Sequence, residues 1–214
     1  MPEDDRMNSR ELQAAAAAII AGGRRLGARG LIVAAEGNLS VRVGDRLLVT
    51  PSGRRKDELV GDNLLLLTAD PTGPAIDPDR PDLRPTSDLR IHRAIYAARP
   101  DVRAVAHAHL PASLALTLAG EVPDPAVLPE TALFLPRLPV LALMTMGSPA
   151  LAEAVAAALG DGTEPNNAVL LERHGAVAVG LSVDAAVDRL ELVELLCRVW
   201  RDARLLGWRP PGQA

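Results

Sequence analysis

The stretch PTSDLRIHRAIYAARPDVRAVAHAHLPASLALTL, residues 85–118, contains three of the four histidines of the chain. Within it, residues 104–106 form a short apolar run that leads directly into His107 and His109. Residues i and i+2 of a strand point to the same face, whereas in a helix this spacing would place the two rings on nearly opposite sides. The pair can therefore share one metal ion only if the segment is extended. A proline at position 111 and a glycine at 120 predict a helix over 111–119, which supports the strand before it.

The fourth histidine, His174, follows a second apolar run and is followed by Gly175 and a third run over 176–179. Three imidazoles at two strand ends would leave one coordination position open, which is the ligand pattern of a catalytic zinc site. The alternative is that each histidine is an ordinary core or surface residue, which is the more frequent role of a histidine beside an apolar run. The His107 and His109 pair alone does not decide between them.

Composition limits the classes of protein to consider. The 214 residues are enough for one domain with a sizeable core, so we expect a single domain over 1–214. Aromatic residues make up 2% of the chain and apolar residues 48%, so the core must be built from alanine, leucine and valine. The net charge is −4 and the arginines are dispersed, which argues against a nucleic-acid surface.

The single cysteine, Cys197, excludes a disulfide within the chain and a cysteine metal cluster. The first residues lack the basic start of a signal peptide, and the longest early apolar run, residues 14–21, is too short to span a bilayer. We therefore expect a cytoplasmic protein with no membrane partner.

Turn and cap residues divide the chain into elements. Helices are expected from Asn8 to about Gly22 and Gly23, over 88–99, over 149–159 after Ser148, and from Ser182 to Gly207. Strands are expected around Gly44 as a hairpin, near residue 67, at 140–143 and on both sides of His174. The proline-rich segments 70–85 and 122–139 are interpreted as irregular loops. This order predicts an α/β fold in which helices cover both faces of a mixed, mainly antiparallel sheet.

Three turns are candidates for anion binding. They are 37–40, 50–53 and 86–88, and each lies at the end of a strand or at the start of a helix. Free backbone N–H groups and hydroxyls at such positions can bind an anion, although most such turns bind nothing. Asp88 opens its helix and His92 lies four residues further on the same face. For His92, a hydrogen bond within the fold is the more frequent role, and for Asp88 a helix cap is the alternative to catalysis.

Six motifs in order resemble the class II aldolase/adducin family, and most closely its sugar-phosphate members such as L-fuculose-phosphate aldolase. The resemblance covers nearly the whole chain, and the order of the motifs is more specific than any one of them. The motifs are GNLSVR at 37–42, VTPSG at 49–53, TSDLRIH at 86–92, RPD at 99–101, AVAHAH at 104–109 and RHGAV at 173–177.

The resemblance implies a three-layer α/β/α fold and a homotetramer with active sites at subunit boundaries. It also implies zinc, or another divalent metal, held by His107, His109 and His174, with Asp88 as the general acid/base carboxylate. The implied substrate is a phosphorylated sugar, and its phosphate would be bound by residues from all three turns: Asn38, Ser52, Gly53, Thr86 and Ser87.

Two departures from the family bear on the reaction. The aldolases usually have glutamate where this chain has Asp88, and aspartate is more like the related ribulose-phosphate epimerase. The aldolases also use tyrosines near the metal, whereas the one tyrosine here, Tyr96, falls inside a helix. We predict a metal-dependent aldolase that cleaves a ketose phosphate through a metal-stabilised enediolate. A sugar-phosphate 4-epimerase and a 3-oxo-tetronate-phosphate-type decarboxylase are the alternatives on the same scaffold.

Two further classes are less favoured. A Schiff-base aldolase needs a lysine with a lowered pKa, and the only lysine, Lys56, lies among charged residues that predict a solvated setting. A non-enzymatic module, as in adducin, has no reason to keep three imidazoles in ligand register.

Overall fold

The fold is built on one seven-stranded sheet, seen in a computed structural model that describes residues 3–163 and 166–210. The strand order is β3-β2-β1-β4-β7-β6-β5. The strands are β1 (Asn38–Val43), β2 (Arg46–Val49), β3 (Leu65–Thr68), β4 (Ala104–Ala108), β5 (Val140–Leu141), β6 (Ala168–Leu171) and β7 (Gly175–Gly180). Only the β5 and β6 pair is parallel, and the other pairs are antiparallel. The predicted mixed, mainly antiparallel sheet is confirmed.

Strand β4 lies at the centre of the sheet, between β1 and β7, and all five of its residues are buried. Its register places His107 opposite Asn38 on β1 and opposite Val177 on β7. Alternate residues of a strand face opposite sides, so the alanines of β4 belong to the core on one face while Val105 belongs to the core on the other. His107 therefore faces the same side as Val105.

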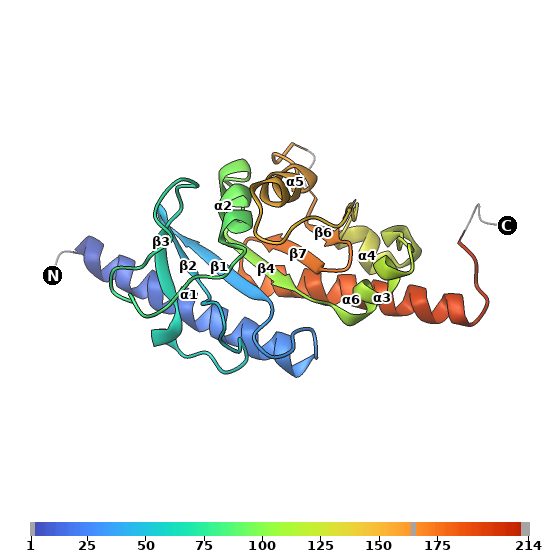
Figure 1. Ribbon diagram of the computed structural model, residues 1–214, viewed down its shortest axis with the longest axis horizontal. Helices are drawn as coiled ribbons and strands as arrows, with labels where there is room; N and C mark the ends of the chain where they lie inside the picture. Colours follow the sequence, from blue (N-terminus) through green and yellow to red (C-terminus); the bar gives the residue numbers. More distant parts are fainter. Residues whose placement is uncertain (1–2, 164–165, 211–214) are drawn as a thin grey trace.

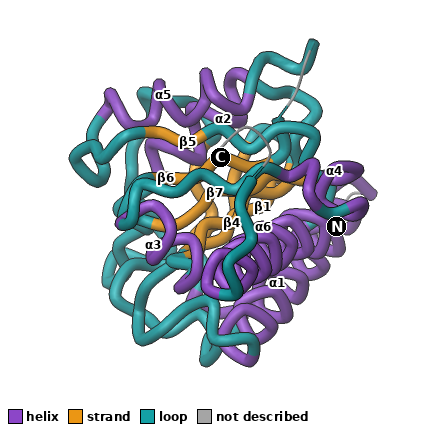
Figure 2. Tube along the Cα trace, turned by 90° about the vertical axis from the view of Figure 1, so that its right-hand side faces the viewer, coloured by secondary structure: helices purple, strands orange, loops and turns teal. Residues whose placement is uncertain are grey.

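Helices cover both faces of the sheet and make three layers (Figures 1 and 2). Helices α1 (Glu3–Ala28), α3 (Pro111–Leu118) and α6 (Val183–Leu205) pack on one face, and α2 (Leu89–Ala98) and α5 (Pro149–Leu159) cover the other. The capping residues predicted for α5 and α6 are confirmed, because Ser148 accepts a hydrogen bond from Leu151 N and Ser182 accepts one from Ala185 N. The α/β/α arrangement agrees with that expected from the sequence.

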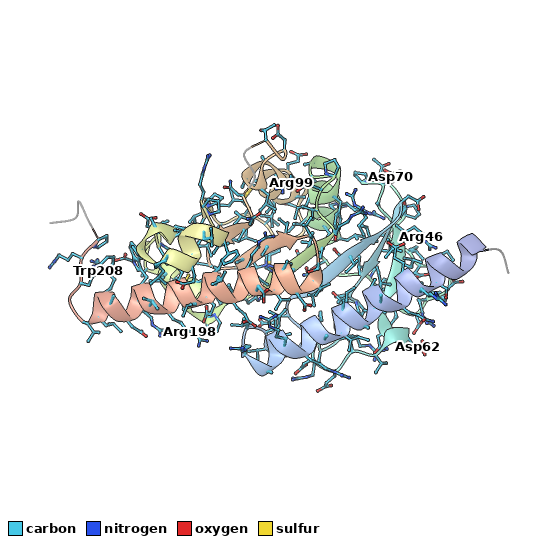
Figure 3. All side chains as sticks on the ribbon, turned by 180° about the vertical axis from the view of Figure 1, so that it is seen from behind. Arg46, Asp62, Asp70, Arg99, Arg198 and Trp208 are labelled. Carbon is cyan, nitrogen blue, oxygen red and sulfur yellow. The ribbon has the colours of Figure 1, made fainter. Side chains whose placement is uncertain are left out.

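A buried arginine joins the two helices of the α2 layer. Arg99, labelled in Figure 3, caps the C-terminal end of α2 and donates from Nη1 to the carbonyl oxygen of Leu159 at the end of α5, at 2.9 Å. Its Nη2 lies 2.7 Å from a carboxylate oxygen of Asp101. The side chain of Arg99 is 4% exposed, so this ion pair is largely shielded from solvent on the arginine side. The contact holds in place the layer that carries Asp88.

Helix α1 does not stop at Gly22 and Gly23, and that prediction is wrong. The helix continues to Ala28 because the two glycines serve close packing instead of termination. A Cβ atom at position 23 would lie 2.1 Å from the carbonyl oxygen of Lys56, and one at position 22 would lie 2.6 Å from Val183 Cγ1. The glycines let neighbouring segments approach the helix backbone.

The segment 122–139 is not entirely irregular, which corrects the loop expected there. It contains a short 3₁₀ helix η2 (Pro125–Val127) and helix α4 (Pro129–Phe134), and a second 3₁₀ helix, η1 (Gly61–Asn63), precedes β3. A proline is favourable as the first helical residue, where its missing N–H would have no intrahelical partner. Two of the prolines that suggested a loop are therefore helix starts. The strand expected over 140–143 is also shorter, because β5 ends at Leu141.

Helix α6 is the longest helix after α1, and its stripe of apolar residues is buried as expected. Cys197 on this stripe is fully buried, and burial raises the pKa of its thiol to about 12. Among the described helices, none combines the length and the apolar character that crossing a membrane would require.

Candidate metal and active site

Three histidines meet at one end of the central strands. His107 and His109 come from β4 and the residue just after it, and His174 comes from the turn between β6 and β7. Their ligand atoms all lie within 4.8 Å of one another, and the ring centroids are 4.9 to 5.1 Å apart. The predicted convergence of the three rings is present, and His92 lies outside the cluster.

Hydrogen bonds orient two of these rings. His107 Nδ1 lies 2.9 Å from the carbonyl oxygen of Ala176, and His109 Nδ1 lies 2.8 Å from Oε2 of Glu36. An oxygen acceptor at Nδ1 fixes the proton there, so Nε2 of each ring presents a lone pair. His107 Nε2 is buried and has no hydrogen-bond partner among the described residues. A buried acceptor without a partner is costly, and a divalent cation would satisfy it, so the three side chains fit a metal.

Glycine at position 175 lets the His174 turn reach β4. Gly175 has a φ of 118°, and a Cβ atom there would lie 2.2 Å from the carbonyl oxygen of Ala108. Any side chain would push the β6–β7 turn away from β4. Position 175 of the Arg-His-Gly motif thus requires glycine because the strands that carry the histidines come so close together there.

Burial favours the neutral form of His107 and His174. Desolvation lowers the pKa of His107 to about 3 and lowers the pKa of His174 below its ordinary value. Neutral imidazoles are the metal-binding form, so these two rings are ready to bind a cation at neutral pH.

We expect the metal-free protein to lose stability as the pH falls below about 6.5, the ordinary pKa of histidine. His107 and His92 have pKa values of about 3 and about 4 in the folded state, both lowered by burial, so the unfolded chain binds more protons in this range. The stability that the two neutral histidines contribute is complete above pH 6.5, and it declines as the pH falls towards their pKa values in the folded protein. Urea unfolding in a chelator at pH 7.5, 6 and 5 measures it. In a His107→Asn variant, the free energy of unfolding should change with pH less steeply than in the wild type, by about 1.4 kcal/mol per pH unit. Equal slopes in the two proteins would contradict the prediction.

Asp88 lies beside the cluster and does not cap its helix through the side chain. It occupies the N-cap position of α2, yet it makes no side-chain cap hydrogen bond. Its Oδ2 instead accepts from Nδ2 of Asn38 at 2.8 Å and lies 3.9 Å from Nε2 of His107. Burial alone raises the pKa of the Asp88 carboxyl, but His107 and the Asn38 amide lower it, and the net pKa is below its usual value. The carboxylate is ionised and 5% exposed.

Backbone hydrogen bonds bring the three predicted anion-binding turns together. Ser52 N donates to the carbonyl oxygen of Arg84 at 2.8 Å, and Thr86 N donates to that of Thr50 at 3.2 Å. Thr50 in turn exchanges hydrogen bonds with Leu39 of β1. Of the five candidate phosphate-binding residues, Ser52, Gly53 and Ser87 are exposed, whereas Asn38 and Thr86 are buried.

Sequence reasoning missed Glu36 and misjudged Lys56. Glu36 orients His109, and the only signal for it was its position directly before the Gly-Asn turn. The solvated setting expected for Lys56 is wrong: the residue is 2% exposed, and its Nζ donates to the carbonyl oxygens of Ala35 and Arg54 at 2.6 and 2.7 Å. Burial lowers its pKa to about 8. Its charged neighbours in sequence point outward while the lysine turns in, and its bonds tie the Glu36 loop to the Ser52 turn.

The chain is similar in sequence and in fold to known proteins. The model of the family described as "Class II Aldolase and Adducin N-terminal domain" matches residues 17–201. A 5-methylthioribulose-1-phosphate/5-deoxyribulose-1-phosphate aldolase of Rhodospirillum rubrum is 34% identical, and the alignment covers 86% of this chain and 79% of the relative. A 3-oxo-tetronate 4-phosphate decarboxylase of Cupriavidus necator is 33% identical, over 83% and 79%. The crystal structure of an L-fuculose-1-phosphate aldolase from Thermus thermophilus superimposes with a TM-score of 0.78 at 30% identity and covers 94% of this chain and 98% of that one.

Proposed function

Because this chain belongs to the class II aldolase and adducin family, we propose that it is a metal-dependent lyase that cleaves a phosphorylated ketose. The observation that carries the proposal is the three-histidine cluster with the ionised Asp88 beside it. A purely structural member of the family has no use for a buried, unpartnered imidazole nitrogen aimed at two other histidines. The sugar-phosphate aldolases among its relatives support the substrate class.

The proposed ligands are His107, His109 and His174, and zinc suits their three nitrogens with one position left open. A bound divalent ion would supply Lewis acidity to the carbonyl and hydroxyl oxygens of the substrate and so stabilise negative charge as the carbon–carbon bond breaks. Glu36 and the carbonyl of Ala176 hold the rings of His109 and His107 so that Nε2 faces the shared point.

Asp88 is the proposed general acid/base. In aldol cleavage a base removes the proton of the hydroxyl whose carbon becomes the new aldehyde, and an acid then returns a proton to the carbon that keeps the electron pair. The ionised carboxylate of Asp88 is suited to the first step, and the acid it becomes is suited to the second. Its position 3.9 Å from His107 Nε2 puts Oδ2 within reach of a substrate oxygen at the cluster.

The proposed phosphate site is formed by Asn38, Ser52, Gly53, Thr86 and Ser87. The backbone bonds that bring their turns together support it, as does the exposure of Ser52 and Ser87. Asn38 is already bonded to Asp88 through Nδ2, but an amide nitrogen carries two hydrogens and can offer the second to an anion.

We expect Ser87→Ala to raise the KM for a ketose phosphate about tenfold while kcat changes little, because a hydrogen bond to a charged group contributes about 1.5–3 kcal/mol. Crystals soaked in inorganic phosphate should show the anion against residues 52–53 and 86–87. Thr72→Ala, an exposed hydroxyl in the 70–85 loop, is the matched control with unchanged KM. Phosphate bound elsewhere and absent from residues 52–53 and 86–87, or equal turnover of unphosphorylated ketoses, would refute the site.

Substrate profiling of the zinc-loaded protein tests the function itself. The panel is 5-deoxyribulose 1-phosphate, 5-methylthioribulose 1-phosphate and L-fuculose 1-phosphate, with release of an aldehyde and a three-carbon ketose phosphate as the expected result. A second candidate, decarboxylation of a 3-oxo acid phosphate, is favoured by the Cupriavidus necator relative and would appear as carbon dioxide from 3-oxo-tetronate 4-phosphate. Epimerisation would leave the carbon skeleton intact. No turnover of any of these compounds would reject the proposal.

We also propose a homotetramer in the cytoplasm with active sites at subunit boundaries. Two large apolar side chains on the segment that follows β5 are exposed: Leu143 is 51% exposed and Met146 is 66% exposed. Apolar side chains left in contact with solvent support assembly into an oligomer. Cys197 is a free cysteine buried in α6, and a chain without a disulfide suits a cytoplasmic protein. Analytical ultracentrifugation gives the oligomeric state directly.

A further inference from the structure

A buried row of polar side chains runs inward from Asp88, away from the histidine cluster. Asn38 Oδ1 lies 2.6 Å from His92 Nε2, and His92 Nδ1 lies 2.6 Å from the Ser40 hydroxyl. That hydroxyl lies 2.9 Å from the hydroxyl of Tyr96. None of these four side chains, Asn38, His92, Ser40 and Tyr96, is more than 3% exposed. We call this row the Asp88 relay.

The relay arises where a helix face meets a strand face of matching spacing. Asp88, His92 and Tyr96 are separated by four residues each along α2, and Asn38 and Ser40 are separated by two along β1. Four helical residues advance about 6 Å and two strand residues about 6.6 Å, so the two rows stay in step. Each helix side chain therefore meets a strand side chain, and the guanidinium of Arg42 closes the row with its Cζ 4.9 Å from the centroid of the Tyr96 ring.

The hydrogen bonds of the relay have one direction. An ionised carboxylate only accepts, so the amide nitrogen of Asn38 must face Asp88 and its oxygen must face His92. His92 Nε2 then carries the proton and Nδ1 accepts from the Ser40 hydroxyl. Tyr96 donates to Ser40, through either Oγ or the carbonyl oxygen at 3.1 Å. Donation thus runs from Tyr96 to Asp88 through Ser40, His92 and Asn38. At the far end of the row, Nε of Arg42 has no hydrogen-bond partner among the described residues.

We infer that His92, Ser40 and Tyr96 are positioning residues for the reaction: they hold the Asn38 amide with its N–H towards Asp88 and so fix where the carboxylate points. The inference rests on the proposed acid/base role of Asp88. His92 is fully buried and lies outside the metal cluster, so it contacts neither the metal site nor the substrate. If the His92 ring carried its proton on Nδ1, an acceptor would face the Asn38 oxygen and the amide would turn its own oxygen to Asp88.

The first test is the tautomer of His92 in the metal-free wild-type protein. Nitrogen-15 NMR of histidine-labelled protein should show His92 as the neutral form protonated at Nε2, with Nδ1 accepting a hydrogen bond. This measurement needs neither a substrate nor a variant that folds. A ring protonated at Nδ1, or one averaging between the two tautomers, would overturn the inference.

The second test separates positioning from packing. His92→Phe keeps an aromatic ring but removes both nitrogens, and we expect kcat on 5-deoxyribulose 1-phosphate to fall about 10- to 100-fold with KM and metal content unchanged. His92→Gln, which restores a donor and an acceptor, should recover part of the loss. Ile95→Ala, a buried apolar residue of the same helix, is the matched control: it lowers stability and leaves kcat near the wild-type value.

A double-mutant cycle distinguishes the failure of this inference from that of the proposed function. His92→Phe added to Asp88→Asn should cost no further activity, because the relay acts through Asp88. A large loss in Asp88→Asn with full kcat in His92→Phe, or an additive loss in the double variant, rejects the relay alone. Full turnover in Asp88→Asn rejects the role of Asp88, and the relay with it.

Discussion

His174→Ala is expected to lose nearly all of its bound metal. The cluster offers three imidazoles within 4.8 Å, and a site reduced to two ligands no longer holds a divalent ion through dialysis. Metal analysis of the purified variant by mass spectrometry measures the loss, with about one ion per chain expected for the wild type. Full occupancy in the variant would remove His174 from the site.

His92→Ala is the matched control for that measurement. The ring nitrogens of His92 lie against Asn38 and Ser40, so removing the ring should leave the metal in place even if stability falls. In the wild type, metal affinity should decline at acidic pH because neutral imidazoles are required. Burial lowers the pKa values of His107 and His174, so the decline begins at a lower pH than it would for exposed histidines.

The second large effect is expected for Asp88→Asn, with a turnover about 10² to 10⁴ lower and a normal fold and metal content. Asparagine has the same shape and can still accept a hydrogen bond from Asn38, so the local structure should persist. It cannot take up a proton at neutral pH. Steady-state rates, melting temperature and metal content measured together on this variant would decide the role.

Asp82→Asn serves as a matched control for Asp88→Asn, because Asp82 is an exposed carboxylate in the loop that precedes α2. It should leave turnover unchanged. If Asp88→Asn behaved like this control, the carboxylate would have no part in the reaction. The absence of a side-chain cap bond at Asp88 already argues against its serving only to cap α2.

The sequence was most informative where local periodicity and end signals agree. The strand through His107, the turn at His174 and the capped helices α5 and α6 follow from patterns that span a few residues each. The order of motifs then supplied the family, and with it the three-layer arrangement. These features depend on neighbours in sequence, which a single chain displays directly.

What could not be predicted depends on neighbours in space. Gly23 looks like a helix stop, but in the fold it makes room for the backbone at Lys56. Lys56 is surrounded by charges in sequence and by carbonyl oxygens in space. Likewise, Tyr96 lies outside the six motifs and Ser40 lies within one that gave it no role, and the row they complete appears only when α2 lies along β1.

The burial of Lys56 also determines how fast the protein reacts with reagents that acylate amines. It is the only lysine of the chain, so in the folded protein the chain's one ε-amino group is withheld from acylating reagents. Labelling Lys56 requires its bonds to Ala35 and Arg54 to break. The released amine is no longer buried, so it regains the ordinary lysine pKa of about 10.4 and reacts at alkaline pH. The acylation rate of this one side chain therefore reports how often the protein opens locally at Lys56, where its bonds join the loop that carries Glu36 to the turn that carries Ser52.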